Sequence, residues 1–220
     1  MDGVLQSLFS PSTVVREIRS ANLDESFLWP EEEKYLRNVS QKRRWDFVTG
    51  RKCAHLALAA LGIEPIQVLS GDAKEPIWPQ DIVGSITHSK DYAAAAVARK
   101  TEMLSLGLDA ETDEPLPERV LARIGNEDEI NWVRGGKSND FRNPGKILFS
   151  AKEATFKAWY PMTHEWLGFR EAHITFEPNR NTFIVDIERQ GPITKFFGTF
   201  SVDQGIILTA IQVPVSQVEN

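Results

Sequence analysis

The segment MLSLGLDAET, residues 103–112, has the side-chain alternation of a β-strand. The apolar parity comprises Leu104, Leu106, Leu108 and Ala110, and the other parity comprises Ser105, Gly107, Asp109 and Glu111. Successive side chains of a strand point to opposite faces, so a period of two residues is typical of this structure. The segment therefore predicts a strand that carries acidic side chains on one face.

The carboxylates of Asp109, Glu111 and Asp113 follow this period and are expected to face the same way. Same-face side chains of a strand lie roughly 6.5–7 Å apart, so flexible carboxylates can converge on one cation. Mg²⁺ prefers such oxygen ligands, together with water and substrate phosphate. An isolated pattern of this kind also suits a solvated strand end. An EF-hand is excluded, because Glu114 and Val120 stand where its loop needs glycine and glutamate.

A second segment, FSAKEATFKAW at residues 149–159, has helical spacing. At about 100° per residue, Phe149, Phe156 and Tyr160 form one narrow stripe. Glu153 lies just off that stripe, Lys157 lies beyond it on the same side, and Lys152 flanks the stripe from the other side. The pattern predicts a helix with a carboxylate beside an aromatic surface and with cations on both sides.

Two interpretations of this helix remain open at this point. A glutamate four residues before a lysine commonly forms a surface pair that contributes only a few tenths of a kcal/mol, about 0.3–0.5. The position of Glu153 near the apolar stripe instead favours a catalytic surface for a charged substrate. In that case its nearest partners should be Asp109 and Glu111 or their metal, rather than Lys157.

Other segments predict alternating helices and strands around these two motifs. WPEEEKYLRNV (29–39) begins like a helix, and residues 41–61 form one long helix or two abutting ones that stop at Gly62. Residues 82–89 and 92–98 predict a hairpin, although the alanine run alone would suit a helix. Residues 115–134 read as helical and broken near Gly125, and 134–146 as a loop. A four-strand meander is expected from AHITFEP (172–178), TFIVDIE (182–188), KFFGTFSV (195–202) and GIILTAIQV (205–213), before a frayed tail.

Composition limits the class of protein. The 220 residues carry a formal net charge of −6, which weighs against a surface built to bind nucleic acid but allows a local basic site. The single cysteine, Cys53, cannot form an internal disulfide, so a reducing cytoplasmic compartment is expected. No signal peptide is expected at the start, and no apolar run approaches the roughly 20 residues that span a bilayer.

The remaining candidate groups are basic. His88 lies among hydroxyls in SITHSK (85–90), where a histidine is commonly structural, although imidazolium is a good phosphate donor. Arg43, Arg44 and Arg51 suit either a solvated helix face or phosphate binding, because arginine binds phosphate in a bidentate manner.

The order of these motifs is more specific than any one of them. KEPIWP (74–79), THS (87–89), GLDAE (107–111) and FSAKEATFKAWYP (149–161) follow an arginine-rich helix. The set resembles the 4′-phosphopantetheinyl transferases, in particular the larger Sfp-type branch and, within it, the enterobactin synthetase component D group. The resemblance runs from about residue 40 to about residue 165. Leu108 and Thr87 depart from the isoleucine and serine that are frequent in the family, and neither change removes a functional group.

The resemblance implies an α+β fold of two similar halves, related by a pseudo-twofold axis, with the active site in the cleft between them. Residues 1–105 would form the N-terminal half and 106–220 the C-terminal half. It implies a monomer that transfers phosphopantetheine from coenzyme A to a serine of an apo carrier protein and releases 3′,5′-ADP. Mg²⁺ would be the cofactor.

The resemblance also implies roles for individual residues. The metal carboxylates would be Asp109, Glu111 and Glu153, and the catalytic residues Glu153 and Lys157. Residues that bind coenzyme A would be Arg43 or its rival Arg44, Arg51, Lys74, His88, Lys152 and Lys157, with the last of these at the pyrophosphate.

Alternatives remain from other functional classes. The same carboxylates could serve a Mg²⁺-dependent phosphohydrolase that uses water as its nucleophile. A silent nucleotide-binding or carrier-binding module is the alternative outside enzymes, although it has no chemical need for intact Asp109, Glu111, Glu153 and Lys157. Carriers of siderophore, other nonribosomal peptide, antibiotic, polyketide or fatty-acid synthesis all stay open.

Overall fold

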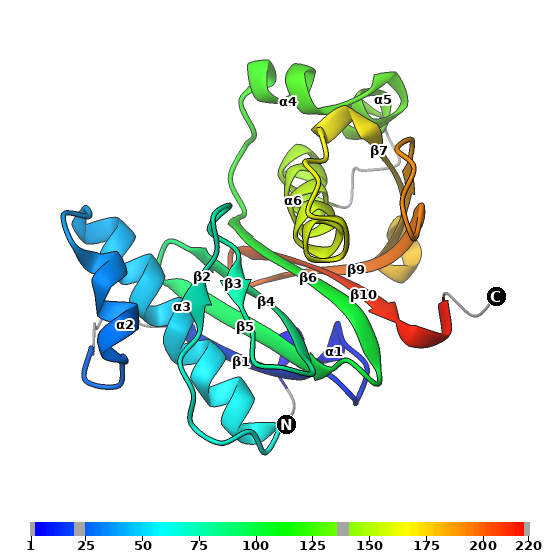
Figure 1. Cartoon of the computed structure of the whole chain (residues 1–220). Coiled ribbons are helices and arrows are strands. Elements are labelled where there is room, and N and C mark those ends of the chain that lie inside the picture. The colour runs from blue at the N-terminus through cyan, green and yellow to red at the C-terminus, as the bar shows by residue number, and fades with distance from the viewer. Residues whose placement is uncertain (1–2, 20–24, 136–140, 218–220) are drawn as a thin grey trace.

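The computed structural model describes residues 3–19, 25–135 and 141–217. In the N-terminal half, a long helix packs on a three-stranded antiparallel sheet of order β1-β5-β4 (Figure 1). Its elements are α1 (Val4–Ser7), β1 (Val14–Arg19), α2 (Pro30–Glu33), η1 (Lys34–Leu36), α3 (Gln41–Ala60), β2 (Leu69–Ser70), β3 (Pro76–Ile77), β4 (Ile82–Ser89) and β5 (Tyr92–Arg99). The long helix is α3, and β2 and β3 form a separate small hairpin.

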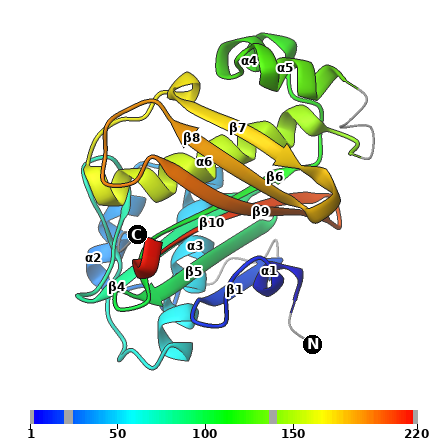
Figure 2. The same cartoon turned by 90° about the vertical axis from the view of Figure 1, so that its right-hand side faces the viewer.

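The C-terminal half contains a five-stranded antiparallel sheet of order β6-β10-β9-β8-β7. Its elements are β6 (Met103–Thr112), α4 (Glu118–Ile124), α5 (Glu127–Arg134), α6 (Pro144–Thr163), η3 (Phe169–Glu171), β7 (Ala172–Glu177), η4 (Pro178–Arg180), β8 (Thr182–Ile187), β9 (Lys195–Asp203), β10 (Ile206–Pro214) and η5 (Val215–Gln217). Figure 1 looks nearly along α6 and shows this sheet curling around it, and in Figure 2 β7 to β9 lie across its length.

The alanine run of the hairpin is explained by cover on both faces of β5. Ala93 and Ala95 belong to the core cluster that includes α3, whereas Ala94 and Ala96 belong to the cluster that includes β6. Small side chains allow both neighbouring layers to approach this strand closely. The turn is made at Lys90, whose φ is 52°. The expected hairpin is therefore confirmed, and the helical alternative for these alanines is wrong.

Strand β6 joins the two halves of the molecule. Its apolar parity, with Leu106 and Leu108, is buried in the cluster shared with the N-terminal sheet. Its other parity faces α6 in an ordered ladder: Ser105 against Ala158, Gly107 against Ala154, Asp109 against Ser150, and Glu111 against Lys146. Two residues of a strand and four residues of a helix advance by nearly the same distance, roughly 6–7 Å, so the two elements stay in step.

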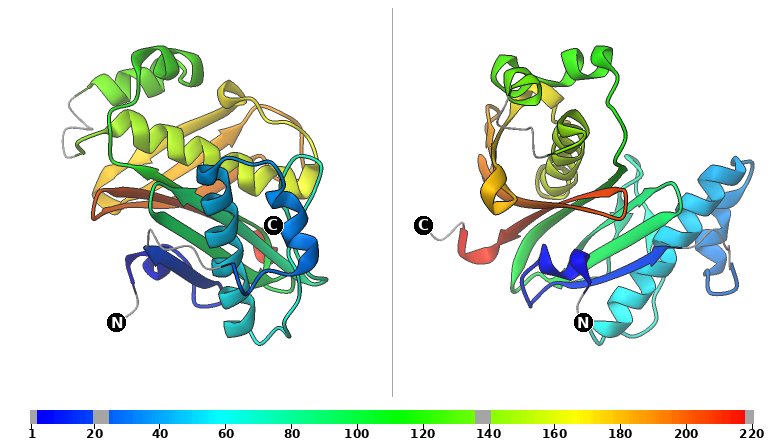
Figure 3. Two further views of the ribbon diagram at one scale, coloured as in Figure 1. Left: turned by 90° about the vertical axis from the view of Figure 1, so that its left-hand side faces the viewer. Right: turned by 180° about the vertical axis from the view of Figure 1, so that it is seen from behind.

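Two hydroxyl groups connect β4 to β6, although these strands belong to different sheets. The Ser85 side chain accepts a hydrogen bond from the Leu108 backbone at 3.0 Å, and the Thr87 side chain accepts one from Ala110 at 2.9 Å. At this junction, hydrogen bonds from backbone to side chain therefore connect two strands that form no backbone ladder with each other. Figure 3 shows α3 (blue to cyan) and α6 (yellow-green) as two separate long helices, one from each half.

Most of the predicted elements are confirmed, and so is the α+β fold class. Residues 41–60 form one helix, and the break near Gly125 and the final meander are present. The loop predicted for 134–146 is wrong at its end, because α6 already begins at Pro144; residues 136–140 lie outside the described part. Strand β1 was not anticipated. The predicted division at 105/106 falls inside β6 and stays a prediction.

The tail predicted to fray contains a short 3₁₀ turn, Val215–Gln217, and residues 218–220 lie outside the described part. Among the helices of the described residues, none is long and apolar enough to cross a membrane.

Candidate active site

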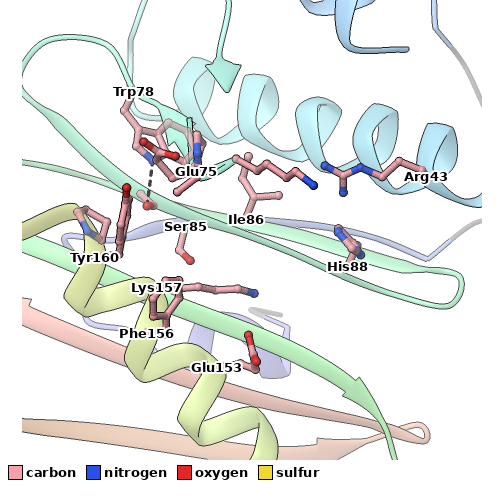
Figure 4. A pocket seen from close by; sticks show the side chains of 15 residues that line it. Arg43, Glu75, Trp78, Ser85, Ile86, His88, Glu153, Phe156, Lys157 and Tyr160 are labelled. Carbon is pink, nitrogen blue, oxygen red and sulfur yellow. Dashed lines mark hydrogen bonds between the residues drawn. The ribbon is translucent and has the colours of Figure 1, made fainter. Parts of the chain in front are cut away.

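A cleft of about 470 Å³ lies between the two halves. Its lining from the N-terminal half includes Arg43, Lys74, Glu75, Trp78, Ser85 and His88, and its lining from the C-terminal half includes Glu153, Phe156, Lys157 and Tyr160. Figure 4 shows Arg43, His88, Lys157 and Glu153 toward one end and Trp78, Glu75 and Tyr160 toward the other. One end of the cleft is therefore charged and the other is largely aromatic.

Asp109 contacts Lys157 beside the charged end, although neither Asp109 nor Glu111 is among the residues that line the cleft. Only 5% of Asp109 is exposed. Its Oδ2 accepts a hydrogen bond from Ser150 at 2.8 Å, and its Oδ1 lies 2.8 Å from the Lys157 ammonium and 3.4 Å from the Thr87 hydroxyl. Three elements, β4, β6 and α6, thereby hold this side chain in one place.

Glu111 and Glu153 lie close enough to Asp109 for their charges to interact. Burial and then the negative charge of Asp109 raise the pKa of Glu111, and its ion pair with Lys146 at 3.2 Å opposes that rise. Burial and Asp109 also raise the pKa of Glu153, whereas Lys157 opposes it. Three carboxylates thus share a partly desolvated region, where further negative charge is unfavourable.

Lys157 does not form the surface pair that its spacing from Glu153 allows. Its ammonium contacts Asp109 at 2.8 Å, the Leu108 carbonyl at 3.0 Å and the Thr87 hydroxyl at 3.4 Å. Within the described part of the chain, Glu153 has neither a hydrogen bond nor an ion pair. After burial, the largest influence on its pKa is Asp109. The surface-pair interpretation of this helix is therefore wrong, and the ammonium joins the strand carboxylate instead.

The basic residues of α3 divide into two groups. Arg43 lines the cleft. Arg44 instead contacts Glu25 at 2.8 Å and the Leu36 carbonyl at 3.3 Å. Of these two rivals for a phosphate, the structure brings only Arg43 to the cleft.

Arg51 is buried beneath the small β2–β3 hairpin rather than in the cleft lining. It donates to the Ser70 hydroxyl at 2.8 Å and to the Leu69 carbonyl at 3.3 Å, and it stacks on Phe47. Burial lowers its pKa to about 10. The same hairpin region carries Lys74, which does line the cleft and has a φ of 68°.

His88 lines the cleft from the end of β4. Its Nδ1 lies 3.5 Å from Oδ1 of Asp46, a residue of α3 that is 6% exposed. Burial lowers the pKa of His88; Asp46 opposes that shift, and the positive charges of Lys157 and Arg43 add to it.

Lys152 lies away from the cleft, contrary to the role expected for it as a ligand contact. Its ammonium pairs with Glu129 of α5 at 2.8 Å and donates to the Phe169 and Ala172 carbonyls, both at 2.7 Å. Both charged side chains are 1% exposed. The helical wheel placed Lys152 beside the aromatic stripe, but it could not indicate that α5 and η3 would cover that side.

The carboxylate cluster has the donor chemistry that Mg²⁺ requires. In the described residues no three acidic or other ligating side chains are already arranged around one point. Lys157 and Lys146 instead neutralise Asp109 and Glu111. Burial and, after it, the negative charge of Asp109 raise the pKa values of Glu111 and Glu153, and a bound cation would compensate that negative charge. The three carboxylates therefore fit a hard divalent cation once the two ammonium groups move aside.

Several residues of this site escaped the sequence argument. Lys146 and Ser150 precede Ala154 at helical spacing, and this four-residue period was the signal that could have placed them against the strand. Thr87 was noted as a neighbour of His88 and as a departure from the family's serine, but not as a contact of Asp109. Asp46 carries no motif, because its partner lies in a different element.

Comparison with known proteins gives two family matches that together cover most of the chain. Residues 31–98 match the 4′-phosphopantetheinyl transferase N-terminal domain, and residues 105–211 match the 4′-phosphopantetheinyl transferase superfamily. Both matched ranges contain residues of the cleft.

Individual relatives agree with these matches. The chain is 42% identical to 4′-phosphopantetheinyl transferase Npt of Nocardia iowensis, over 83% of this chain and 87% of that protein. It is 38% identical to 4′-phosphopantetheinyl transferase PptT of Mycobacterium tuberculosis, over 95% and 98%. Enterobactin synthase component D of Salmonella typhi is 29% identical, over 69% and 63%.

Proposed function

Because this chain belongs to the 4′-phosphopantetheinyl transferase superfamily, we propose that its cleft binds coenzyme A between the two halves and presents it to a carrier-protein serine. The family acts on coenzyme A and carrier proteins, and this chain is a transferase of that class. The observation that carries the proposal is the cluster of Asp109, Glu111 and Glu153 beside Lys157, of which Glu153 and Lys157 line the cleft.

Coenzyme A brings a pyrophosphate and a 3′-phosphate, and the cleft offers cations for both. Arg43, Lys74, His88 and Lys157 all line the cleft and would bind these phosphates. Arg51 would act from behind by holding the hairpin region that carries Lys74. Asp109, Glu111 and Glu153 would hold Mg²⁺, which when bound supplies positive charge to the pyrophosphate.

Glu153 would receive the proton of the attacking serine. Its carboxyl lines the cleft, has no ion-pair partner among the described residues, and has a pKa raised toward the range useful to a base. The serine oxygen forms a bond to the β-phosphorus, and the bond from that phosphorus to the bridging oxygen breaks. The leaving group is 3′,5′-ADP, whose developing charge Lys157 would stabilise.

The experiment that tests this function combines the protein with coenzyme A, Mg²⁺ and several apo carrier proteins, followed by intact-mass measurement. We expect a phosphopantetheine-sized mass increase on at least one carrier and stoichiometric 3′,5′-ADP. Release of 3′,5′-ADP in the absence of any carrier would favour the phosphohydrolase. Catalytic efficiency across the panel would then identify the preferred carrier.

We further propose that the carriers belong to secondary metabolism. Relatives of this chain include an enterobactin synthase component, which is consistent with siderophore or other nonribosomal peptide carriers. The predictions of a monomer and of a cytoplasmic location stay predictions. Light scattering coupled to size-exclusion chromatography tests the first, and fractionation of the source cells tests the second.

Lys157→Ala is expected to lower kcat by roughly 10²–10³-fold, because the leaving group loses a preorganised positive charge. Steady-state assays with a carrier protein measure this effect. Lys100→Ala is the matched control, since Lys100 is exposed. If Lys157→Ala changed only the melting temperature and left turnover intact, its contact with Asp109 would be structural alone.

A further inference from the structure

Asp46 is a buried acid with no role in the proposed reaction. It lies on α3, it is 6% exposed, and it is not among the residues that line the cleft. Within the described residues its Oδ1 is buried and has no hydrogen-bond partner. A buried acceptor without a partner costs roughly 1–3 kcal/mol, more when it is charged, so this oxygen calls for an explanation.

The group that faces this oxygen is the His88 imidazole. The distance from Nδ1 to Oδ1 is 3.5 Å, which exceeds the usual length of a hydrogen bond, roughly 2.7–3.2 Å. Hydrogen bonds at active sites are often long without ligand and tighten in the complex. A small approach of β4 to α3 would satisfy the buried oxygen and fix the ring.

The surroundings of His88 contain both signs of charge. Asp46 and Arg43 face it from α3, Lys157 from α6, and Asp109 from β6. Without a ligand, burial and the two cations disfavour the imidazolium. A phosphate between these cations would add negative charge on the cleft side of the ring, while Asp46 supplies negative charge behind it.

We propose that Asp46 is a positioning residue that accepts a hydrogen bond from Nδ1–H of His88 and stabilises the imidazolium, whose Nε2–H then donates to a phosphate of coenzyme A. This inference rests on the proposed function, because coenzyme A supplies the phosphate. A carboxylate behind a histidine selects one tautomer and stabilises the charged ring, and replacing the acid by its amide reverses that selection.

The decisive variants are Asp46→Asn, His88→Gln and the double variant, with Asp81→Asn as an exposed control. Calorimetric titration with coenzyme A should show roughly 10–100-fold weaker binding for Asp46→Asn, the loss expected for one charge-assisted hydrogen bond. Because Asp46 acts through His88, the double variant should bind no more weakly than His88→Gln. The exposed control should bind as the wild type does.

Dephospho-coenzyme A, which lacks the 3′-phosphate, shows which phosphate of coenzyme A His88 contacts. If Asp46→Asn weakens the binding of coenzyme A but not that of dephospho-coenzyme A, His88 contacts the 3′-phosphate. An equal loss with both ligands assigns it to the pyrophosphate. Either result supports the coupling of Asp46 to His88.

A measurement on the unaltered protein keeps the proposal testable if Asp46→Asn does not fold. The chain has 4 histidines, so their ring ¹⁵N signals can be resolved and His88 assigned with His88→Gln. In the coenzyme A complex, both ring nitrogens of His88 should carry a proton. An unprotonated Nδ1, unchanged affinity in Asp46→Asn, or additive losses in the double variant would overturn the proposal. Wild-type protein that does not bind coenzyme A would overturn the proposed function as well.

Discussion

Glu153→Gln is expected to lower kcat with a carrier protein by roughly 10²–10⁴-fold, the usual contribution of a positioned general base. The amide keeps the size of the side chain but cannot take a proton from the attacking serine. It also withdraws one carboxylate from the cluster with Asp109 and Glu111. Coenzyme A binding, measured by calorimetry without a carrier, should change far less than turnover.

The fold of this variant should remain intact. Glu153 has no hydrogen bond or ion pair in the described part of the chain, and both burial and Asp109 disfavour its charge. Removing that charge should therefore leave the melting temperature equal or higher. Glu102→Gln, at an exposed turn residue, is the matched control for turnover. Wild-type turnover in Glu153→Gln would refute its role as the base.

Lys152→Met is expected to destabilise the fold by about 3–5 kcal/mol, because it leaves the buried charge of Glu129 without its partner. Glu129 also accepts hydrogen bonds from the Asn126 and Ile174 backbones, so it fixes the start of α5 and the position of β7. Lys152 in turn attaches α6 to both of them. Denaturant unfolding measures the change in the free energy of unfolding.

Two comparisons make this result specific to the buried pair. The pair of Lys195 and Asp186 is more than half exposed on both sides, and Lys195→Met should cost less than about 1 kcal/mol. A double variant, Lys152→Met with Glu129→Leu, should recover part of the loss, since no unpaired charge remains. If Lys152→Met instead kept full stability and raised the KM for coenzyme A, the sequence-based role as a ligand contact would return.

The local features of the fold could be predicted because they depend on neighbours in the sequence. The alternation of residues 103–112 identified β6 and its polar parity, and helical spacing identified α6. Strand β1 could not be predicted from its own sequence. Its six residues form a strand because they pair with β5, as Val14 does with Val97. The alanines of β5 were ambiguous for the same reason, since the elements that cover them, α3 and β6, come from other parts of the chain.

The sequence could predict which residues belong to the candidate site, but not which residues each of them contacts. Motif order brought Asp109, Glu111, Glu153 and Lys157 together before any coordinates. It predicted ligand contacts for both Lys152 and Lys157, although in the structure Lys152 pairs with Glu129 and Lys157 with Asp109. Arg43 and Arg44 are likewise neighbours in the sequence, yet Glu25 engages only Arg44 in the described structure.

By itself, the sequence determined the side-chain period of each main element, the acidic face of the strand at residues 103–112 and the order of motifs that places the chain in its family. These properties follow from spacing along the backbone. Only the tertiary structure decided that Lys157 joins Asp109, that Lys152 is buried against Glu129, and that Asp46 lies behind His88. Burial and charge pairing depend on distances between segments far apart in the chain, and spacing along the backbone does not contain those distances.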